Sequence, residues 1–114
     1  MTLTINVDYI GNTTVIALDG ELDLHSYRDV AELAAQNLTN GHLNVIIDLS
    51  RLNFCDSAGL RTFIRHRNNV QAKGGQLILA APQHVVRRVL EISGLVDFFG
   101  CYETIDEART CIEE

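Results

Sequence analysis

Apolar and polar residues alternate at the start of the chain. Leu3, Ile5 and Val7 are separated by polar residues, a period of two that predicts a strand with one buried face. A second apolar run at residues 13–18 predicts another strand, which ends at an Asp-Gly pair. A Gly-Asn pair marks a turn between the two runs, and because this connection is short we expect an antiparallel hairpin.

Four later segments have apolar residues at helical spacing. The first opens at Ser26, which forms a capping-box pattern with Asp29, and the last opens in the same way at Thr104. Glycines after the first three segments are typical helix stops, and Pro82 suits the first turn of the third. The residues expected to face the sheet are Tyr27, Val30, Leu33, Ala34 and Leu38, then Leu60, Phe63, Ile64 and Val70, then Val85, Val86, Val89 and Leu90, and finally Ala108, Cys111 and Ile112.

Short apolar runs lie between these helical segments. Residues 43–49 predict a buried strand followed by a loop at residues 50–55, residues 76–80 predict another strand, and residues 98–102 a short edge strand. Strands that alternate with helices imply parallel pairing through right-handed crossovers. The sequence therefore predicts a single α/β domain over residues 1–114, with a mixed β-sheet (an N-terminal antiparallel hairpin plus parallel strands) flanked by about four helices.

Composition is that of an ordinary folded domain. Of the 114 residues, 46% are hydrophobic and 21% are charged, so the chain can form a core and is not disordered. We expect neither a membrane span nor a secretory signal. Cys55, Cys101 and Cys111 form no metal-ligand or disulfide pattern, which favours buried thiols in a reducing cytoplasm. The net charge of -6 argues against nucleic acid as a partner.

Residues 53–60 connect the most apolar strand to the second helix. Ser57 falls at or next to the N-cap of that helix, and capping alone is enough to explain Asp56 and Ser57. The position also suits a phosphate, because a helix N-terminus carries unpaired N–H groups and the positive end of the dipole. Arg61 and Arg65 follow Ser57 at intervals of four, so Arg61 could reach a phosphoserine, or both could form a solvated face.

The patterns of common enzyme sites are absent or incomplete. Neither a P-loop nor a dinucleotide fingerprint occurs, and Cys55 replaces a glycine that a serine-hydrolase elbow requires. The histidines are scattered, with His66 and His84 expected on helix surfaces. Asp23, Asp48 and Asp56 could gather at one sheet edge and hold Mg²⁺, but capping and loop hydrogen bonds explain them more simply. We therefore expect no catalytic residue, no metal and no cofactor, and leave nucleotide binding open.

Five stretches, in this order along nearly the whole chain, resemble the STAS domain, and most closely the bacterial anti-sigma-factor antagonists. The most specific is Asp-Ser-Ala-Gly-Leu at residues 56–60. The others are Gly-Glu-Leu-Asp at 20–23, Val-Ile-Ile-Asp-Leu-Ser at 45–50, Gly-Gly-Gln-Leu at 74–77 and Val-Leu-Glu-Ile-Ser-Gly-Leu at 89–95.

The resemblance implies a switch controlled by phosphorylation. Antagonists of this family bind an anti-sigma factor, usually an ATP-dependent serine kinase, and so free a sigma factor for transcription. The kinase phosphorylates the serine of the Asp-Ser-x-Gly motif, which is Ser57 here, the phosphorylated antagonist is released, and a PP2C-type phosphatase resets it. The residues implied at the partner interface are Asp23, Asp56, Ser57, Ala58, Gly59, Arg61 and Arg65.

Two residues depart from the pattern of many relatives. Arg61 stands where a small residue is common, and either holds the phosphate or selects a particular kinase; Cys55 replaces an aliphatic residue conservatively. We expect a monomer or weak dimer that is not an enzyme and that contacts neither nucleic acid nor membrane. The alternative is a non-phosphorylated STAS subunit of an ABC-type lipid-transport complex.

Overall fold

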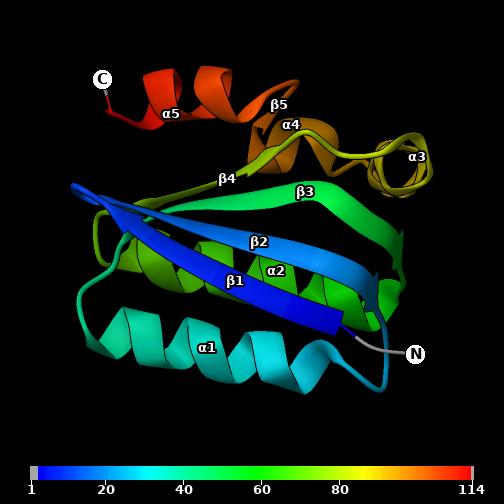
Figure 1. Cartoon of the computed structure of the whole chain (residues 1–114), viewed down its shortest axis with the longest axis horizontal. Coiled ribbons are helices and arrows are strands. Elements are labelled where there is room, and N and C mark those ends of the chain that lie inside the picture. The colour runs from blue at the N-terminus through cyan, green and yellow to red at the C-terminus, as the bar shows by residue number, and fades with distance from the viewer. Residues whose placement is uncertain (1–2, 114) are drawn as a thin grey trace.

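Five strands form one mixed sheet in the order β1-β2-β3-β4-β5 (Figure 1). The structure, a computed structural model, describes residues 3–113. β1 (Leu3–Ile10) and β2 (Thr13–Leu22) are antiparallel, whereas β3 (Asn44–Cys55), β4 (Gln76–Ala80) and β5 (Cys101–Tyr102) run parallel to β2. The predicted hairpin and mixed sheet are confirmed.

β2 and β3 are longer than their apolar runs predict. β3 continues to Cys55, so the predicted loop at residues 50–55 is wrong. The pairing of β2 with β3 shifts register twice in the second half of β2, and such bulges change which face a side chain points to. Leu49, Leu52 and Cys55 are consequently all buried although they lie three residues apart. A spacing of three does not look like a strand, which is why the sequence suggested a loop.

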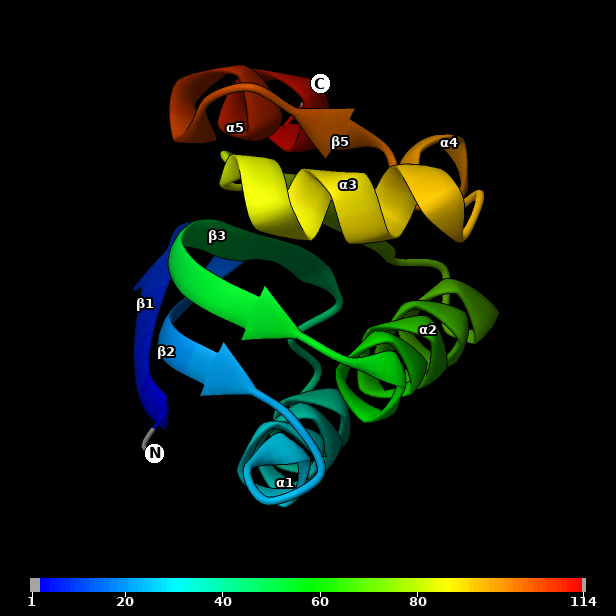
Figure 2. The same cartoon turned by 90° about the vertical axis from the view of Figure 1, so that its right-hand side faces the viewer.

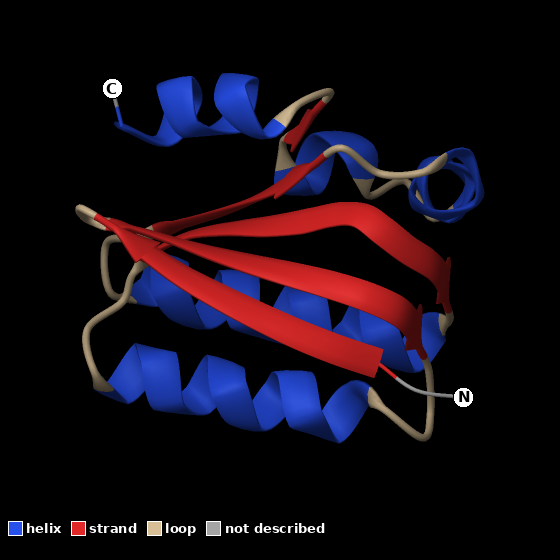
Figure 3. Cartoon of the chain, in the orientation of Figure 1, coloured by secondary structure: helices blue, strands red, loops and turns tan. Residues whose placement is uncertain are grey.

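Helices cover both faces of the sheet. α1 (Tyr27–Thr39) and α2 (Ser57–Ala72) lie against one face, and α5 (Ile105–Glu113) lies against the other (Figures 1 and 3). α3 (His84–Ile92) and α4 (Val96–Phe99) follow β4, and their buried residues join the same apolar cluster as those of α1 and α2. The sequence predicted four of these five helices; α4 is the additional one.

The two faces of the sheet carry two apolar clusters. Neighbouring residues of a strand point in opposite directions, so Ile47 packs in the main cluster with Phe63 of α2, and Ile46 packs in a second cluster with Ala108 of α5. Both strand residues are fully buried. The parallel strands therefore lack the polar alternation of β1, as expected for strands covered on both sides.

The predicted helix ends are confirmed more often than the predicted starts. Gly41, Gly74 and Gly94 have positive φ angles just beyond α1, α2 and α3. The Thr104 hydroxyl accepts the backbone N–H of Glu107 at 3.0 Å and caps α5. Ser26 is the N-cap residue of α1 by position, but its side chain caps nothing there, so the predicted capping box is wrong.

The region after β4 differs most from expectation. Pro82 precedes the N-cap residue of α3 and so lies outside its first turn, and Val85 is 53% exposed instead of facing the sheet. The predicted edge strand at residues 98–102 is reduced to two residues, because Phe99 is buried at the end of α4 and packs edge-on against Phe63, with ring centroids 6.3 Å apart.

The cysteines and the helices bear on two further expectations. Cys55 is buried as predicted, but Cys101 and Cys111 are only half-buried. No helix within residues 3–113 is both long and apolar enough to cross a membrane.

Candidate functional site

The carboxyl ends of β2 and β3 bring two loops together. Leu22 and Cys55 are paired residues at the ends of these parallel strands, so the chain leaves both strands at the same edge and enters α1 and α2 (Figure 2). The backbone N–H of Asp56 donates to the Leu22 carbonyl at 3.2 Å, and the N–H of Leu24 donates to the Asp56 carboxylate at 3.1 Å. The expected proximity of the Asp23 and Asp56 loops is confirmed.

Asp56, not Ser57, is the N-cap residue of α2. One carboxylate oxygen of Asp56 accepts the N–H groups of Ala58 at 2.9 Å and Gly59 at 3.1 Å. Ser57 is the first residue of the helix, and its side chain is exposed. The Ser57 hydroxyl makes no hydrogen bond to any other group within residues 3–113. Because Asp56 caps the helix, the Ser57 hydroxyl is not needed to stabilise the start of α2.

Asp23 organises the neighbouring loop. Its carboxylate accepts the backbone N–H groups of His25 at 2.9 Å and Ser26 at 3.1 Å. The bond from His25, followed by those from Ser26, lowers the pKa of Asp23 below its usual value. The Ser26 hydroxyl donates to the Glu21 carbonyl at 2.8 Å and accepts the Asp23 N–H at 3.0 Å, which explains why it is not available to cap α1.

Gly59 holds the start of α2 against the sheet. A Cβ atom at this position would lie 2.8 Å from both the Cys55 sulfur and Cγ of Leu22, closer than real contacts allow. Gly59 is buried and Ala58 is half-buried, so of this pair only Ala58 presents a side chain that a partner could touch. Burial raises the pKa of the Cys55 thiol to about 12, helped by the charge of Asp56, so the thiol next to the site stays protonated and unreactive.

The three aspartates do not form a metal site. Asp48 lies in the middle of β3, paired with Ala17 and Ala80, and its carboxylate accepts the N–H of Ser50 at 2.9 Å. No group of three or more metal-binding side chains occurs in the part of the chain that the structure describes. Capping by Asp56 and loop bonding by Asp23, which the sequence favoured, are confirmed, whereas Asp48 bonds an amide within β3 and not one in a loop.

His66 is buried, although the sequence analysis expected it on a helix surface. Its side chain is only 2% exposed, and neither ring nitrogen has a hydrogen-bond partner among residues 3–113. Burial lowers its pKa to about 4. His66 follows Phe63 by three residues and precedes Val70 by four, which is the spacing of the inner stripe, so the pattern could have found it.

This burial predicts a pH-dependent stability. The unfolded chain takes up a proton on His66 near pH 6.5, whereas the folded protein resists until about pH 4, so stability is lost as the pH falls through this window. The His66→Leu variant lacks this penalty. Between pH 7 and pH 5, we expect the wild-type protein to lose about 2 kcal/mol of unfolding free energy relative to the variant, measured by urea denaturation. The exposed-site control His84→Gln should follow the wild type; parallel curves for wild type and His66→Leu would contradict the prediction.

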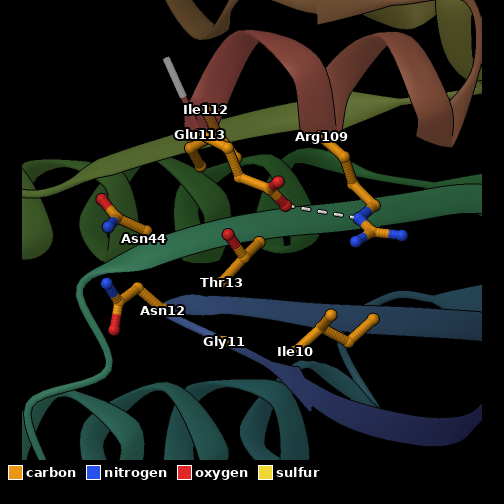
Figure 4. Close-up of a pocket in the computed structure, with 8 residues that line it drawn as sticks. All are labelled: Ile10, Gly11, Asn12, Thr13, Asn44, Arg109, Ile112 and Glu113. Carbon is orange, nitrogen blue, oxygen red and sulfur yellow. Dashed lines mark hydrogen bonds and ion pairs between the residues drawn. The ribbon is translucent and has the colours of Figure 1, made fainter.

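Two hollows are present on the described surface. One lies between α1 and α2 beside Ser57 and is lined by Ala58, Arg61 and Arg65 together with residues of α1. The other lies at the opposite end of the sheet, where the β1–β2 turn approaches α5 (Figure 4). In that second hollow Arg109 and Glu113 form an ion pair of 3.4 Å (Figure 4), so its charged groups already neutralise each other.

Arg61 and Arg65 are exposed and make no ion pair within residues 3–113. They lie on the side of α2 that faces α1, where their charges help to lower the pKa of Tyr27, behind the larger effect of Arg28. The structure thus brings Asp23, Asp56, Ser57, Ala58, Arg61 and Arg65 to one end of the molecule, with Gly59 buried beneath them. Leu24, which the sequence analysis passed over, is 67% exposed within this group.

Comparison with known proteins agrees with this architecture. The family model described as the STAS domain matches residues 4–108. The chain is 28% identical to an anti-sigma F factor antagonist of Paenibacillus polymyxa over 99% of this chain and 97% of the relative. It is 33% identical to that of Lysinibacillus sphaericus over 73% and 72%.

Solved structures have the same fold. The phosphorylated form of SpoIIAA, a Bacillus cell fate determinant, superposes with a TM-score of 0.77 at 27% identity, over 96% of this chain and 99% of that one. The match of the family model over most of the chain, together with this superposition, shows that this protein belongs to the STAS domain family.

Proposed function

We propose that this chain is an anti-sigma factor antagonist that binds a serine kinase and is released from it by phosphorylation of Ser57. The observation that carries the proposal is the exposed Ser57 hydroxyl, which begins α2 beside the Asp23 loop and caps nothing. Relatives along nearly the full length are named anti-sigma F factor antagonists, and a similar structure is of a phosphorylated form. In this proposal the chain is the substrate of the kinase and not an enzyme.

A phosphate on Ser57 would change the surface without changing the fold. The capping bonds of Asp56 use the backbone N–H groups of Ala58 and Gly59, and none of them involves the Ser57 hydroxyl. A phosphate carries a charge of about -1.5 to -2. At this position it would increase the negative charge that the carboxylates of Asp23 and Asp56 already provide. Arg61, one turn along α2, is the nearest cation in the sequence that could offset part of this charge.

A protein partner also needs apolar contact area. Leu24 is 67% exposed and is held in place by the hydrogen bond from its N–H to Asp56. An exposed leucine on a loop fixed in this way can bury apolar area against a partner. A kinase that docks here would cover Leu24 and Ser57 together, so a phosphate left on Ser57 would have to lose its water within the interface.

Transfer of phosphate to Ser57 is the test of this proposal. The protein is incubated with ATP, Mg²⁺ and each candidate anti-sigma factor serine kinase of the same organism, and the mass of the intact chain is measured. We expect a gain of one phosphate that disappears in Ser57→Ala, persists in the control Ser93→Ala, which changes an exposed serine after α3, and is reversed by a PP2C-type phosphatase. No transfer, combined with co-purification with a transporter ATPase, would instead favour the lipid-transport subunit.

Asp23 offers a way to separate charge from loop shape. We expect Asp23→Ala to weaken kinase binding at least tenfold, because it removes both the charge and the bonds to His25 and Ser26. Asp23→Asn keeps an oxygen that can accept those bonds and removes only the charge. Titration calorimetry with the kinase decides: near-normal binding of Asp23→Asn assigns Asp23 to the loop, and equal binding of all three proteins would remove Asp23 from the interface.

A further inference from the structure

The hollow between α1 and α2 is an elongated groove of about 500 Å³. Small-molecule sites in proteins have volumes of about 300–1,000 Å³, so the groove has the size of a ligand site. On α1 its lining extends from Tyr27 to Thr39, which corresponds to about 18 Å along the helix. A groove of this length between two helices suits a linear ligand better than a compact one.

The wall formed by α1 is apolar. Ala31, Ala34 and Ala35 face the groove, and Leu38 follows one turn later. The small alanine side chains leave the space that a larger residue would fill. This wall carries no charged side chain among the residues that line the groove, so it matches a hydrocarbon chain.

At the end near Ser57, the wall formed by α2 is positively charged. Arg61 and Arg65 line the groove there, across from Tyr27. In a protein with a net charge of -6, these two guanidinium groups have no acidic partner within residues 3–113. Paired guanidinium groups at the mouth of an apolar groove are complementary to a carboxylate head group.

His66 lies in the same groove and adds a third requirement. Its side chain is buried, with only 2% of its surface exposed, and neither ring nitrogen has a hydrogen-bond partner within the described residues. A buried polar group without a hydrogen bond destabilises the folded protein, so each such group needs an explanation, and a bound ligand is one. A ligand that carries a hydroxyl group on its chain would satisfy one of these nitrogens.

We propose that the α1–α2 groove binds a medium-chain hydroxylated carboxylic acid. Its carboxylate pairs with Arg61 and Arg65, its hydrocarbon chain lies along Ala31, Ala34 and Ala35, and its hydroxyl bonds to the imidazole of His66. This proposal does not depend on the kinase or on Ser57, and its test uses neither.

Titration calorimetry of the full chain with decanoate and 5-hydroxydecanoate, whose hydroxyl group lies at mid-chain because His66 directly follows Arg65, provides the test. We expect saturable binding of both below about 1 mM, with the hydroxylated acid at least threefold tighter. Arg61→Gln with Arg65→Gln should weaken both acids at least tenfold, and His66→Leu should abolish the preference for the hydroxyl group. Arg88→Gln, at an exposed site of α3 outside the lining of the groove, is the matched control and should change nothing.

A second variant guards against loss of folding. Ala31→Phe fills the groove from a half-buried position and should prevent binding while its circular dichroism melt stays cooperative. Absence of binding by the wild type, equal affinities in the arginine and Ala31 variants, or binding to anionic vesicles but not to the free acids would each overturn the proposal.

Discussion

Phosphorylated protein is expected to bind the anti-sigma factor kinase about a thousandfold more weakly than unmodified protein. This ratio corresponds to about 4 kcal/mol, which is within reach of a dianion that must be desolvated in an interface. The phosphate would lie beside the carboxylates of Asp23 and Asp56. Its bulk would separate the exposed Leu24 side chain from the kinase surface that it contacts in the proposed complex. Calorimetric titration of kinase with the two purified forms gives the ratio directly.

Variants of the same position refine this expectation. Ser57→Asp adds one charge and less bulk, so it should weaken binding by a smaller factor, and Ser57→Ala should bind normally but resist release in the presence of ATP. Ser93→Asp adds the same charge after α3 and should leave binding unchanged. If Ser57→Asp and phosphorylated protein both bind as tightly as the wild type, charge at this position does not control release.

Gly59→Val is expected to lower the unfolding free energy by about 3 kcal/mol. The added side chain would meet the Cys55 sulfur and Leu22 at 2.8 Å, where both are buried in the main apolar cluster. The same change at the neighbouring position, Ala58→Val, should lower it by less than about 1 kcal/mol, because only helix propensity changes. Urea denaturation of the two variants measures the difference.

A double variant identifies the cause of that loss. Leu22→Ala removes one of the two side chains that the new valine would meet. Gly59→Val with Leu22→Ala should therefore be more stable than the sum of the two single changes predicts, by at least about 1 kcal/mol. Additive effects would show that the clash is relieved elsewhere. Kinase binding of Gly59→Val should also weaken, since Gly59 sets the distance between the Ser57 and Asp23 loops.

The sequence was sufficient wherever local signals agreed with the tertiary structure. Alternation in β1, the apolar run of β4 and the glycines after α1, α2 and α3 each reflect forces that act within a few residues. The position of Ser57 before a helical pattern showed only that a phosphate would be tolerated there, and its role as phosphoacceptor was implied by the resemblance to the STAS family. The second half of β3 was missed because bulges change the period of the strand, and bulges depend on the neighbouring strand.

The amino-acid sequence by itself determined the order of the strands and of every helix except α4, the mixed character of the sheet, and the stretch at residues 56–60 as the place to look for function. Only the tertiary structure decided which oxygen caps α2, how the Asp23 loop meets it and that His66 faces inward. The physical reason is that capping and burial depend on groups distant in the sequence: β2 and β3 must end side by side before Asp56 can bond to Leu24 and leave the Ser57 hydroxyl free.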